Sequence, residues 1–386
     1  MKVCFVVPHF YPHIGGGEKA MLDYIIAMKK YNIEVRVLTS SSGGVVGHKE
    51  YEGIDIYYYD WKVLFGHPLV RRKDLIEHIE WADIVHAAVY SPVRTTSSVC
   101  KKLNKPLIIT VYESLNEKWF WIEENKIKAL MFRVYEKMVL NSKCDYYHTI
   151  SGATTNDLMK NVKKNNIKQI YTVVEMDKNH VEYNREKLNS FFGVKSDDRI
   201  FLSYGRPGKT KGIFIYLDAI KQVVSELSEE ELKHTKFCFI MANDPLAQKQ
   251  KFLKEVEKSN LGEYVIVKDP VERNDLETYI KSCDYVVVPS ITEGFGLSAV
   301  EACEMGTKII HSTGGSLPEV TFGDVLKFEN RNSAALGSIL KDVILGKANF
   351  MKKERKDFSS ETIGKEMYSL YEMVLKNRRN VKWKMH

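Results

Sequence analysis

The chain has 386 residues, of which 44% are apolar and 28% are charged, and its formal net charge is +7. This length is typical of two globular domains, and the apolar content is sufficient for their cores. No apolar run approaches the roughly 18 residues of a membrane span, and no signal peptide is recognisable, so we expect a cytoplasmic protein. The six cysteines have no C-x-x-C spacing, and we expect buried free thiols.

Strand-like and helix-like runs alternate through the first 180 residues. The predicted strands are residues 3–7, 34–38, 54–59, 84–87, 107–111 and 146–150. The predicted helices are residues 18–30, 73–81, 94–103 and 127–140. This alternation is typical of a parallel sheet with helices on both faces, so residues 1–180 are predicted to form a Rossmann-like domain.

The alternation weakens over the polar residues 176–198, where we place the domain boundary. A second series fills residues 195–350. Its predicted strands are residues 200–204, 237–241, 264–267, 285–288, 308–311 and 325–328. Its predicted helices lie near residues 213–226, 273–281, 297–305 and 332–344. Parallel sheets bind ligands at the C-terminal ends of their strands, so we expect a ligand in a cleft between two such domains.

Residues 351–386 are predicted to form a charged crossing segment and a helix over residues 360–377. They contain ten Lys or Arg and five Asp or Glu, which gives a net +5. One interpretation is peripheral attraction to an anionic membrane at its inner face. The alternative is a solvated helix end whose cations suit the helix dipole. Nucleic-acid binding is not expected, because no recognition fold accompanies the charge.

A glycine loop precedes the first predicted helix. Gly15, Gly17 and Ala20 formally match the dinucleotide fingerprint G-x-G-x-x-A. We reject that interpretation, because a seven-residue loop separates the glycines from the strand and the second strand ends without an acidic residue. The loop instead predicts a close approach of another group, such as a diphosphate, to the backbone, with a plain tight loop as the alternative.

A basic glycine loop follows the first strand of the second domain. Residues 203–212 place Arg206, Lys209 and Lys211 among three glycines at a helix start. Arginine grips phosphate oxygens in a bidentate manner and lysine adds a point charge. Such cations stabilise a departing nucleoside diphosphate, although a solvated basic loop is the alternative interpretation.

A third turn combines two carboxylates with glycines. Glu293 precedes a Gly-Phe-Gly turn, and Glu301 follows eight residues later on a predicted helix. Backbone N–H groups at such a helix start suit a phosphate or sugar oxygen, and a carboxylate beside them accepts hydrogen bonds from hydroxyls. A further glycine turn, residues 313–319, also follows a strand, so glycine turns gather at one predicted edge.

In these features the chain resembles the retaining nucleotide-sugar glycosyltransferases of the GT-B fold, specifically glycosyltransferase family 4. The resemblance covers the whole chain and is strongest over residues 200–320. The matching features are Arg206 with Lys211, Glu293 with Glu301, Gly294 to Leu297, Gly314 and Gly315 with Glu319, and Pro12 to Glu18. The resemblance implies an α/β GT-B fold, with two Rossmann-like domains facing a cleft and a C-terminal helix that crosses back to the N-terminal domain.

The resemblance also implies residue roles. Arg206 and Lys211 would hold and neutralise the diphosphate, Glu293 would contact the donor sugar, and these three are the candidate catalytic residues. Glu301 would bind the ribose hydroxyls. The remaining candidate donor contacts are Gly16, Gly17, Gly205, Gly294, Phe295, Gly296 and Leu297. No D-x-D motif occurs, which fits a metal-independent enzyme without a cofactor.

The chain departs from the family on its acceptor side. Many relatives carry a His-Asp pair after the fifth strand, whereas Tyr112 and Glu113 stand here. The candidate acceptor contacts are His9, Tyr112, Glu113 and Trp119. Trp119 begins a Trp-Phe-Trp run that would stack on a sugar or lie at a membrane face, with ordinary helix packing as the alternative.

The resemblance therefore implies a hexosyltransferase that moves a sugar from a nucleotide sugar to a glycan or lipid-linked acceptor with retention of configuration, in polysaccharide biosynthesis of the cell envelope. A phosphorylase or epimerase on the same scaffold is an alternative, because a fold does not fix a reaction. A second alternative is a catalytically weak or silent nucleotide-sugar-binding subunit of a glycosyltransferase complex. It is motivated by the absence of the family's histidine at Tyr112.

Overall fold

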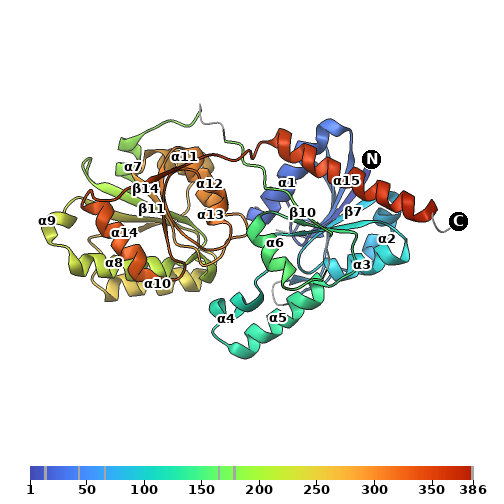
Figure 1. The fold of residues 1–386 in the computed structure, drawn as a ribbon, viewed down its shortest axis with the longest axis horizontal. Helices are drawn as coiled ribbons and strands as arrows, with labels where there is room; N and C mark the ends of the chain where they lie inside the picture. Colours follow the sequence, from blue (N-terminus) through green and yellow to red (C-terminus); the bar gives the residue numbers. More distant parts are fainter. Residues whose placement is uncertain (13–14, 42–43, 65–66, 164–165, 177–179, 384–386) are drawn as a thin grey trace. The chain divides into compact units, whose positions relative to one another are not determined.

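The computed structural model describes all residues except 13–14, 42–43, 65–66, 164–165, 177–179 and 384–386. For residues 379–383 it describes the backbone but not the side chains. The chain forms two compact units (Figure 1). Unit 1 contains Met1–Glu175 and Asp357–His386, and unit 2 contains Met176–Lys356. Each unit is a sheet covered by helices, as the alternating pattern predicts.

Unit 1 is built on an eight-stranded sheet with the strand order β10-β9-β8-β7-β1-β2-β4-β3. Its strands are β1 (Lys2–Val6), β2 (Glu34–Ser40), β3 (Gly47–Tyr51), β4 (Ile54–Tyr59), β7 (Ile84–Ala88), β8 (Leu107–Val111), β9 (Tyr146–Thr149) and β10 (Ile167–Gln169). A separate hairpin joins β5 (Val63–Leu64) to β6 (His67–Pro68). All neighbouring strands of the large sheet are parallel except β3 and β4. Every residue of β7 and β8 is buried, because helices cover both faces of the parallel sheet.

Helices cover both faces of this sheet (Figure 1). They are α1 (Gly16–Met28), α2 (Arg72–Trp81), α3 (Val93–Lys102), α4 (Trp119–Ile122), α5 (Lys126–Leu140), α6 (Gly152–Met159) and α15 (Ser360–Trp383). Short 3₁₀ turns follow α1 and precede α4, at Lys29–Tyr31 and Asn116–Lys118. Two separate apolar clusters, one on each face, form the core of unit 1.

Unit 2 has a seven-stranded sheet with the order β13-β12-β11-β14-β15-β16-β17. Its strands are β11 (Arg199–Gly205), β12 (Thr235–Met241), β13 (Val265–Lys268), β14 (Tyr285–Val288), β15 (Lys308–Ser312), β16 (Gly323–Phe328) and β17 (Met351–Lys353). Its helices are α7 (Arg185–Phe192), α8 (Ile213–Glu226), α9 (Glu229–Leu232), α10 (Leu246–Lys258), α11 (Arg273–Ser282), α12 (Leu297–Glu304), α13 (Leu317–Val320) and α14 (Ser333–Ile344), with a 3₁₀ turn at Lys209–Lys211. Only β17 runs antiparallel to its neighbour.

Two segments behave differently from their sequence patterns. The polar segment predicted to contain the domain boundary includes α7, which Asn184 caps through its side chain and Gly193 ends in a left-handed conformation. This helix belongs to unit 2 and packs against α11. The predicted crossing segment begins with β17, which extends the sheet of unit 2, and the chain enters unit 1 at Asp357.

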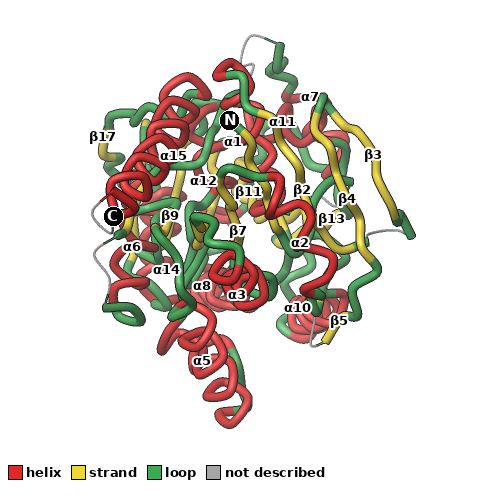
Figure 2. Tube along the Cα trace, turned by 90° about the vertical axis from the view of Figure 1, so that its right-hand side faces the viewer, coloured by secondary structure: helices red, strands yellow, loops and turns green. Residues whose placement is uncertain are grey.

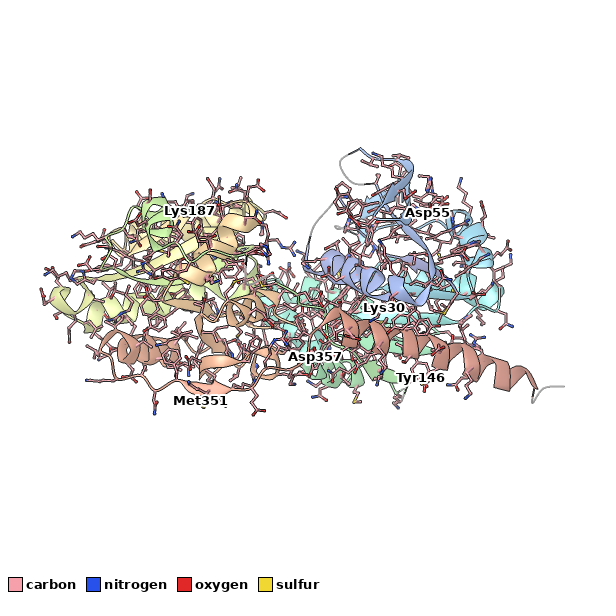
Figure 3. The ribbon with its side chains drawn as sticks, turned by 90° about the horizontal axis from the view of Figure 1, so that it is seen from above. Lys30, Asp55, Tyr146, Lys187, Met351 and Asp357 are labelled. Carbon is pink, nitrogen blue, oxygen red and sulfur yellow. The ribbon has the colours of Figure 1, made fainter. Side chains whose placement is uncertain are left out.

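Helix α15 returns to unit 1 and packs along α1 (Figure 3), as expected for a C-terminal helix that crosses back. Gly364 allows this approach, because a Cβ there would lie 2.5 Å from the carbonyl oxygen of Ala27. The rings of Tyr31 and Tyr368 stack with centroids 4.4 Å apart. Near its end, Arg378 donates to both carboxylate oxygens of Asp145, so this cation of the basic tail fastens the helix to unit 1.

A chain of hydrogen bonds crosses the core of unit 1. It joins the hydroxyl of Tyr371 to His86 Nδ1 at 2.6 Å, His86 Nε2 to Thr110 at 2.5 Å, and Thr110 to His148 Nδ1 at 2.9 Å. His148 Nε2 then donates to the carbonyl oxygen of Ile170 at 3.0 Å. Every group in this chain is satisfied with both imidazoles neutral. Burial accordingly lowers the pKa of both histidines.

Two buried histidines, one in each unit, should make the free energy of unfolding depend on pH. Burial lowers the pKa of His148 in unit 1 and of His311 in unit 2 to about 4. As the pH falls below about 6.5, the unfolded chain gains protons at both sites while the folded chain does not, so stability is lost until the pH reaches about 4. Each histidine should remove about 1.4 kcal/mol of unfolding free energy per pH unit within this window.

Urea unfolding at pH 7.5 and 5.5 measures this effect. His148→Gln retains an amide donor and an acceptor but does not titrate, so we expect the difference between the two pH values to shrink by about 1.4 kcal/mol relative to the wild type. His311→Gln is the matched variant in the other unit. If the unfolding free energy of both variants changed between pH 7.5 and 5.5 as much as that of the wild type, the lowered pKa values of His148 and His311 would be contradicted.

All six cysteines are free, and all except the half-buried Cys144 are buried, which confirms the sequence expectation. Within the described residues, every helix is too short or too polar to cross a bilayer.

Candidate functional site

Three loops meet at one edge of the sheet of unit 2. They are residues 206–212 after β11, 289–296 after β14, and 313–316 after β15. These strands are parallel neighbours, so their C-terminal ends lie together. This places the predicted glycine turns at one edge, where open α/β sheets bind ligands.

Close backbone packing explains the glycines in these loops. A Cβ on Gly212 would lie 1.9 Å from the carbonyl oxygen of Pro289, and one on Gly314 would lie 2.5 Å from that of Ser290. A Cβ on Gly315 would lie 2.2 Å from the carbonyl oxygen of Glu293, and Gly315 also has a φ of +60°. The three loops therefore fit together only when these positions lack side chains.

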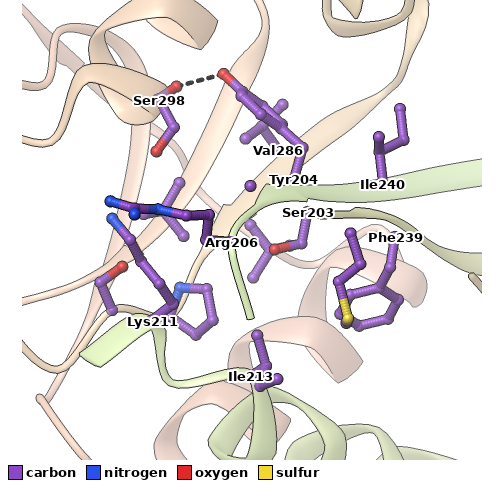
Figure 4. Close-up of a pocket in the computed structure, with 15 residues that line it drawn as sticks. Ser203, Tyr204, Arg206, Lys211, Ile213, Phe239, Ile240, Val286 and Ser298 are labelled. Carbon is purple, nitrogen blue, oxygen red and sulfur yellow. Dashed lines mark hydrogen bonds between the residues drawn. The ribbon is translucent and has the colours of Figure 1, made fainter. Parts of the chain in front are cut away.

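Two cations project from this edge. A shallow, solvent-open hollow has Arg206, Lys211, Ser290 and Ser298 among its lining residues. Both cationic side chains line the same hollow, and in Figure 4 their charged ends point to the same side of it. Arg206 is exposed, whereas Lys211 is half-buried. Neighbouring like charges repel each other, so this arrangement favours a bound anion.

Glu293 lies beside the second of these cations. Its Oε1 accepts hydrogen bonds from Lys211 Nζ and from Ser290 Oγ, both at 2.7 Å. Its Oε2 has no hydrogen-bond partner among the described residues, although only 10% of the side chain is exposed. The carboxylate is therefore fixed in position and retains one oxygen that can accept a hydrogen bond from a ligand hydroxyl.

Glu301 is buried on α12 and forms an ion pair that the sequence did not reveal. Arg273 Nη2 at the start of α11 lies 2.8 Å from Glu301 Oε1. The hydroxyl of Tyr204 donates to the carbonyl oxygen of Ser298 at 2.6 Å, which ties the first turn of α12 to β11 (Figure 4). Burial and the nearby Glu301 raise the pKa of Tyr204 well above its usual value, so this hydroxyl stays neutral.

The remaining donor candidates present mainly backbone groups at this edge. Gly296 has a φ of +83° and precedes the first turn of α12, where helix N–H groups lack partners within the helix. Gly205, with a φ of +123°, ends β11 and lines the hollow. The Phe295 side chain is buried, Leu297 is half-buried, and Gly294 lies between them and Glu293. These positions are consistent with backbone contacts and leave their roles as predictions.

The candidates of unit 1 gather at the C-terminal edge of its own sheet. Gly17 approaches Tyr112, because a Cβ there would lie 3.2 Å from the Tyr112 ring, and Gly16 begins α1 beside it. Burial raises the pKa of Tyr112 well above its usual value, with Tyr24 and Glu18 contributing, so this hydroxyl does not supply a phenolate base. His9 lies after β1 with its Nδ1 3.2 Å from Ser40 Oγ.

Glu136 fixes the loop that follows β8, a role that sequence reasoning missed. This buried carboxylate accepts hydrogen bonds from the N–H groups of Leu115 and Asn116 and from the hydroxyl of Tyr90, at 2.7–2.9 Å. The Tyr90 hydroxyl also lies 2.8 Å from the carbonyl oxygen of Glu113. In the sequence, the only signal of this role is that Glu136 stands as a single acidic residue within the apolar pattern of α5.

Trp119 begins α4, which follows the loop after β8. Its ring packs against Phe132 of α5 with centroids 4.9 Å apart, which fits the helix-packing alternative. Its indole nitrogen is buried without a hydrogen-bond partner among the described residues. An acceptor contact by Trp119 stays a prediction.

Comparison with known proteins matches each unit to a glycosyltransferase family model. Residues 14–178 match the model of Glycosyltransferase Family 4, and residues 184–363 match that of Glycosyl transferases group 1. An uncharacterized glycosyltransferase of Methanocaldococcus jannaschii is 27% identical over 81% of this chain and 79% of that protein. A GDP-mannose:cellobiosyl-diphosphopolyprenol alpha-mannosyltransferase of Xanthomonas oryzae is 23% identical over 79% of this chain and 77% of that protein.

The structural comparison agrees with the sequence comparison. HepE of Anabaena, solved in complex with UDP-glucose, covers 100% of this chain and 100% of its own, with a TM-score of 0.68 and 14% identity. That likeness shows the fold. The parallel sheets, the returning helix and the two family models together place the chain in the GT-B glycosyltransferases of the family 4 type.

Proposed function

We propose that this glycosyltransferase moves a hexose-like unit from a nucleoside-diphosphate sugar to a glycan or lipid-linked acceptor, with retention of anomeric configuration. One observation carries the proposal: Arg206 and Lys211 line the same hollow at the edge of unit 2 where the three glycine-containing loops meet, and Lys211 donates a hydrogen bond to Glu293. This arrangement offers two positive charges for a diphosphate and a carboxylate for a sugar hydroxyl.

Charge development explains why two cations are needed. When the glycosidic bond breaks, the bonding electrons pass to the diphosphate oxygen, which becomes more negative. Arg206 and Lys211 stabilise that charge more strongly in the transition state than in the ground state, which lowers the barrier. In the proposed front-face substitution, the leaving phosphate accepts the acceptor proton. We expect no metal requirement, because the cations supply this charge.

The carboxylates would position the donor. Glu293 Oε2 would accept a hydrogen bond from a sugar hydroxyl while Oε1 stays on Lys211 and Ser290. Glu301 would accept hydrogen bonds from the ribose hydroxyls, with Arg273 holding its Oε1 in an ion pair. The N–H groups at the start of α12 would bind phosphate or sugar oxygens.

Named relatives support the two substrate classes. HepE was solved with UDP-glucose, and the Xanthomonas relative is named for a GDP-mannose donor and a diphosphopolyprenol-linked acceptor. These names differ in the nucleotide base, so both uridine and guanosine donors are candidates for this chain. We propose a cytoplasmic enzyme whose acceptor contacts include His9, Tyr112 and Glu113 at the edge of unit 1.

A second candidate function is a silent nucleotide-sugar-binding subunit. It is favoured by one observation: Tyr112 stands where the family resemblance implies a histidine, and burial raises the pKa of its hydroxyl. Such a chain would bind donor without transferring sugar.

A donor screen tests the proposal. We expect one of the UDP, GDP or ADP sugars to raise the melting temperature of the full chain, and EDTA to leave that shift unchanged. Slow donor hydrolysis should accompany binding. Binding without hydrolysis or transfer would favour the silent subunit, and no shift with any nucleotide sugar would contradict both candidates.

Glu301→Ala should weaken nucleoside-diphosphate binding by roughly 1.5–3 kcal/mol, which is the scale of a charge-assisted hydrogen bond. Calorimetric titration of the full chain with the nucleotide selected above measures this change. Arg273→Gln removes the partner of Glu301 and retains the carboxylate, so it should have a smaller effect. An affinity unchanged in a folded Glu301→Ala variant would contradict the ribose role.

A further inference from the structure

Helix α5 of unit 1 exposes its apolar side. We define its outer face as Ile127, Leu130, Met131, Val134 and Met138, which are between 42% and 74% exposed. These positions are spaced three or four residues apart, so they form one stripe along the helix. Figures 1 and 2 both show α5 projecting from the sheet of unit 1. An apolar stripe of this length on a projecting helix indicates an interaction surface.

The opposite side of α5 prevents the helix from hiding this stripe. Ala129, Glu136, Val139 and Leu140 are its buried residues. Glu136 accepts three hydrogen bonds from the loop after β8 and from Tyr90, so turning the outer face inward would break all of them. Leaving these buried groups unpaired would be costly, so the packing of α5 favours the outward orientation of the stripe. The outward orientation is therefore built into the fold.

The outer face is bordered by cations. At 100° per residue, Lys126, Arg133 and Lys137 flank one side of the stripe and Lys128 flanks the other. Lys128 and Arg133 form ion pairs with Glu123 and Glu117. In contrast, Lys126 and Lys137 are exposed and form no ion pair with a described residue. Every exposed charge on α5 itself is positive.

Neighbouring elements add further exposed apolar side chains. Phe120 and Trp121 of α4, which packs against α5, are 40% and 43% exposed. The β5–β6 hairpin reaches α5 through His67, whose ring lies 6.0 Å from that of Tyr135. Val63 and Leu64 of that hairpin are more than half exposed. The surface therefore extends over two regions distant in sequence.

We propose that the outer face of α5 docks unit 1 onto an anionic lipid bilayer. An apolar stripe with cationic borders has the chemistry of an interfacial helix, which buries its apolar side at the headgroup boundary while its cations attract anionic lipids. A second copy of this chain fits less well, because symmetric pairing of the stripe would bring the same cations together. The outer face belongs to unit 1 and the donor candidates on the α12 loop belong to unit 2, so the test requires no catalytic activity.

Vesicle flotation of the full chain tests this proposal. The probes are vesicles of phosphatidylcholine alone and vesicles containing phosphatidylglycerol as well. We expect binding to the anionic vesicles that weakens with added salt. The variant Ile127→Gln with Met131→Gln and Val134→Gln should lose at least about tenfold in binding, because three apolar side chains no longer enter the bilayer. Lys126→Gln with Lys137→Gln should lose about tenfold on anionic vesicles.

Helix α10 of unit 2 offers matched controls. Leu246→Gln with Leu253→Gln removes comparably exposed apolar residues, and Lys254→Gln with Lys258→Gln removes comparable exposed charges. Both control variants should bind vesicles as the wild type does. Equal binding by the apolar α5 variant and the wild type would overturn the proposal, as would an equal loss in the controls. A concentration-dependent dimer in sedimentation that disappears only in the α5 variant, without vesicle binding, would assign the surface to a second copy.

Discussion

Replacing Lys211 by alanine should lower kcat for glycosyl transfer by about 10²–10³-fold, which is typical for removing one group that stabilises developing charge. The loss has two causes. The departing diphosphate loses a cation, and Glu293 keeps only Ser290 as a partner on Oε1. Arg206→Ala should lower kcat by about 10²-fold with a smaller change in donor affinity, because Arg206 is exposed and acts on the charge alone.

Single-turnover kinetics and calorimetric donor binding separate the two effects. Lys209 provides the matched control, because it belongs to the same 3₁₀ turn but is not among the residues lining the hollow. Lys209→Ala should therefore leave kcat within a few-fold of the wild type. Equal losses of turnover and donor affinity in Arg206→Ala would mean that the cation only binds the ground state.

Gly315→Ala should destabilise unit 2 by about 3–5 kcal/mol, which combines a left-handed backbone with overpacking. Its Cβ would lie 2.2 Å from the carbonyl oxygen and 2.5 Å from the backbone nitrogen of Glu293. The segment carrying Glu293 must then shift, so donor binding should be lost as well. Gly306 is the matched control, since its φ of +76° is similar but no atom lies within 4 Å of its Cβ position.

Urea unfolding and donor calorimetry measure both variants. Gly306→Ala should lower the free energy of unfolding by about 1–2 kcal/mol, because the only cost there is an alanine in the left-handed backbone conformation. This variant should retain donor binding. Similar losses in both variants would show that backbone conformation alone decides the outcome. A Gly315→Ala variant that binds donor normally would contradict the assigned packing of the three loops.

The buried strands could be predicted because burial on both sheet faces leaves a continuous apolar run, as in β8 and β14. The edge strands β3 and β17 could not, because each is exposed and depends on pairing with a partner strand. Helix α10 was also missed. Its many lysines and glutamines resemble a solvated loop, and only packing against α8 shows which side is buried.

Within the site, the sequence indicated the residue types but not all of their pairings. Arg206, Lys211 and Glu293 were expected together because glycine turns follow adjacent strands. The hydrogen bond from Lys211 to Glu293, which the sequence did not indicate, joins two of those turns. The Arg273–Glu301 pair had no signal, because Arg273 begins an ordinary amphipathic helix whose position depends on the sheet. Distant pairings of this kind arise from tertiary packing.

Retaining sugar transfer is tested most directly by a reaction with the nucleotide sugar that binds the full chain, followed by NMR of the products with EDTA present. We expect one nucleoside diphosphate to be released per sugar transferred, and a new glycosidic bond with the anomeric configuration of the donor. Binding of the donor without any product on glycan or lipid-linked acceptors, or a product of inverted configuration, would contradict retaining transfer.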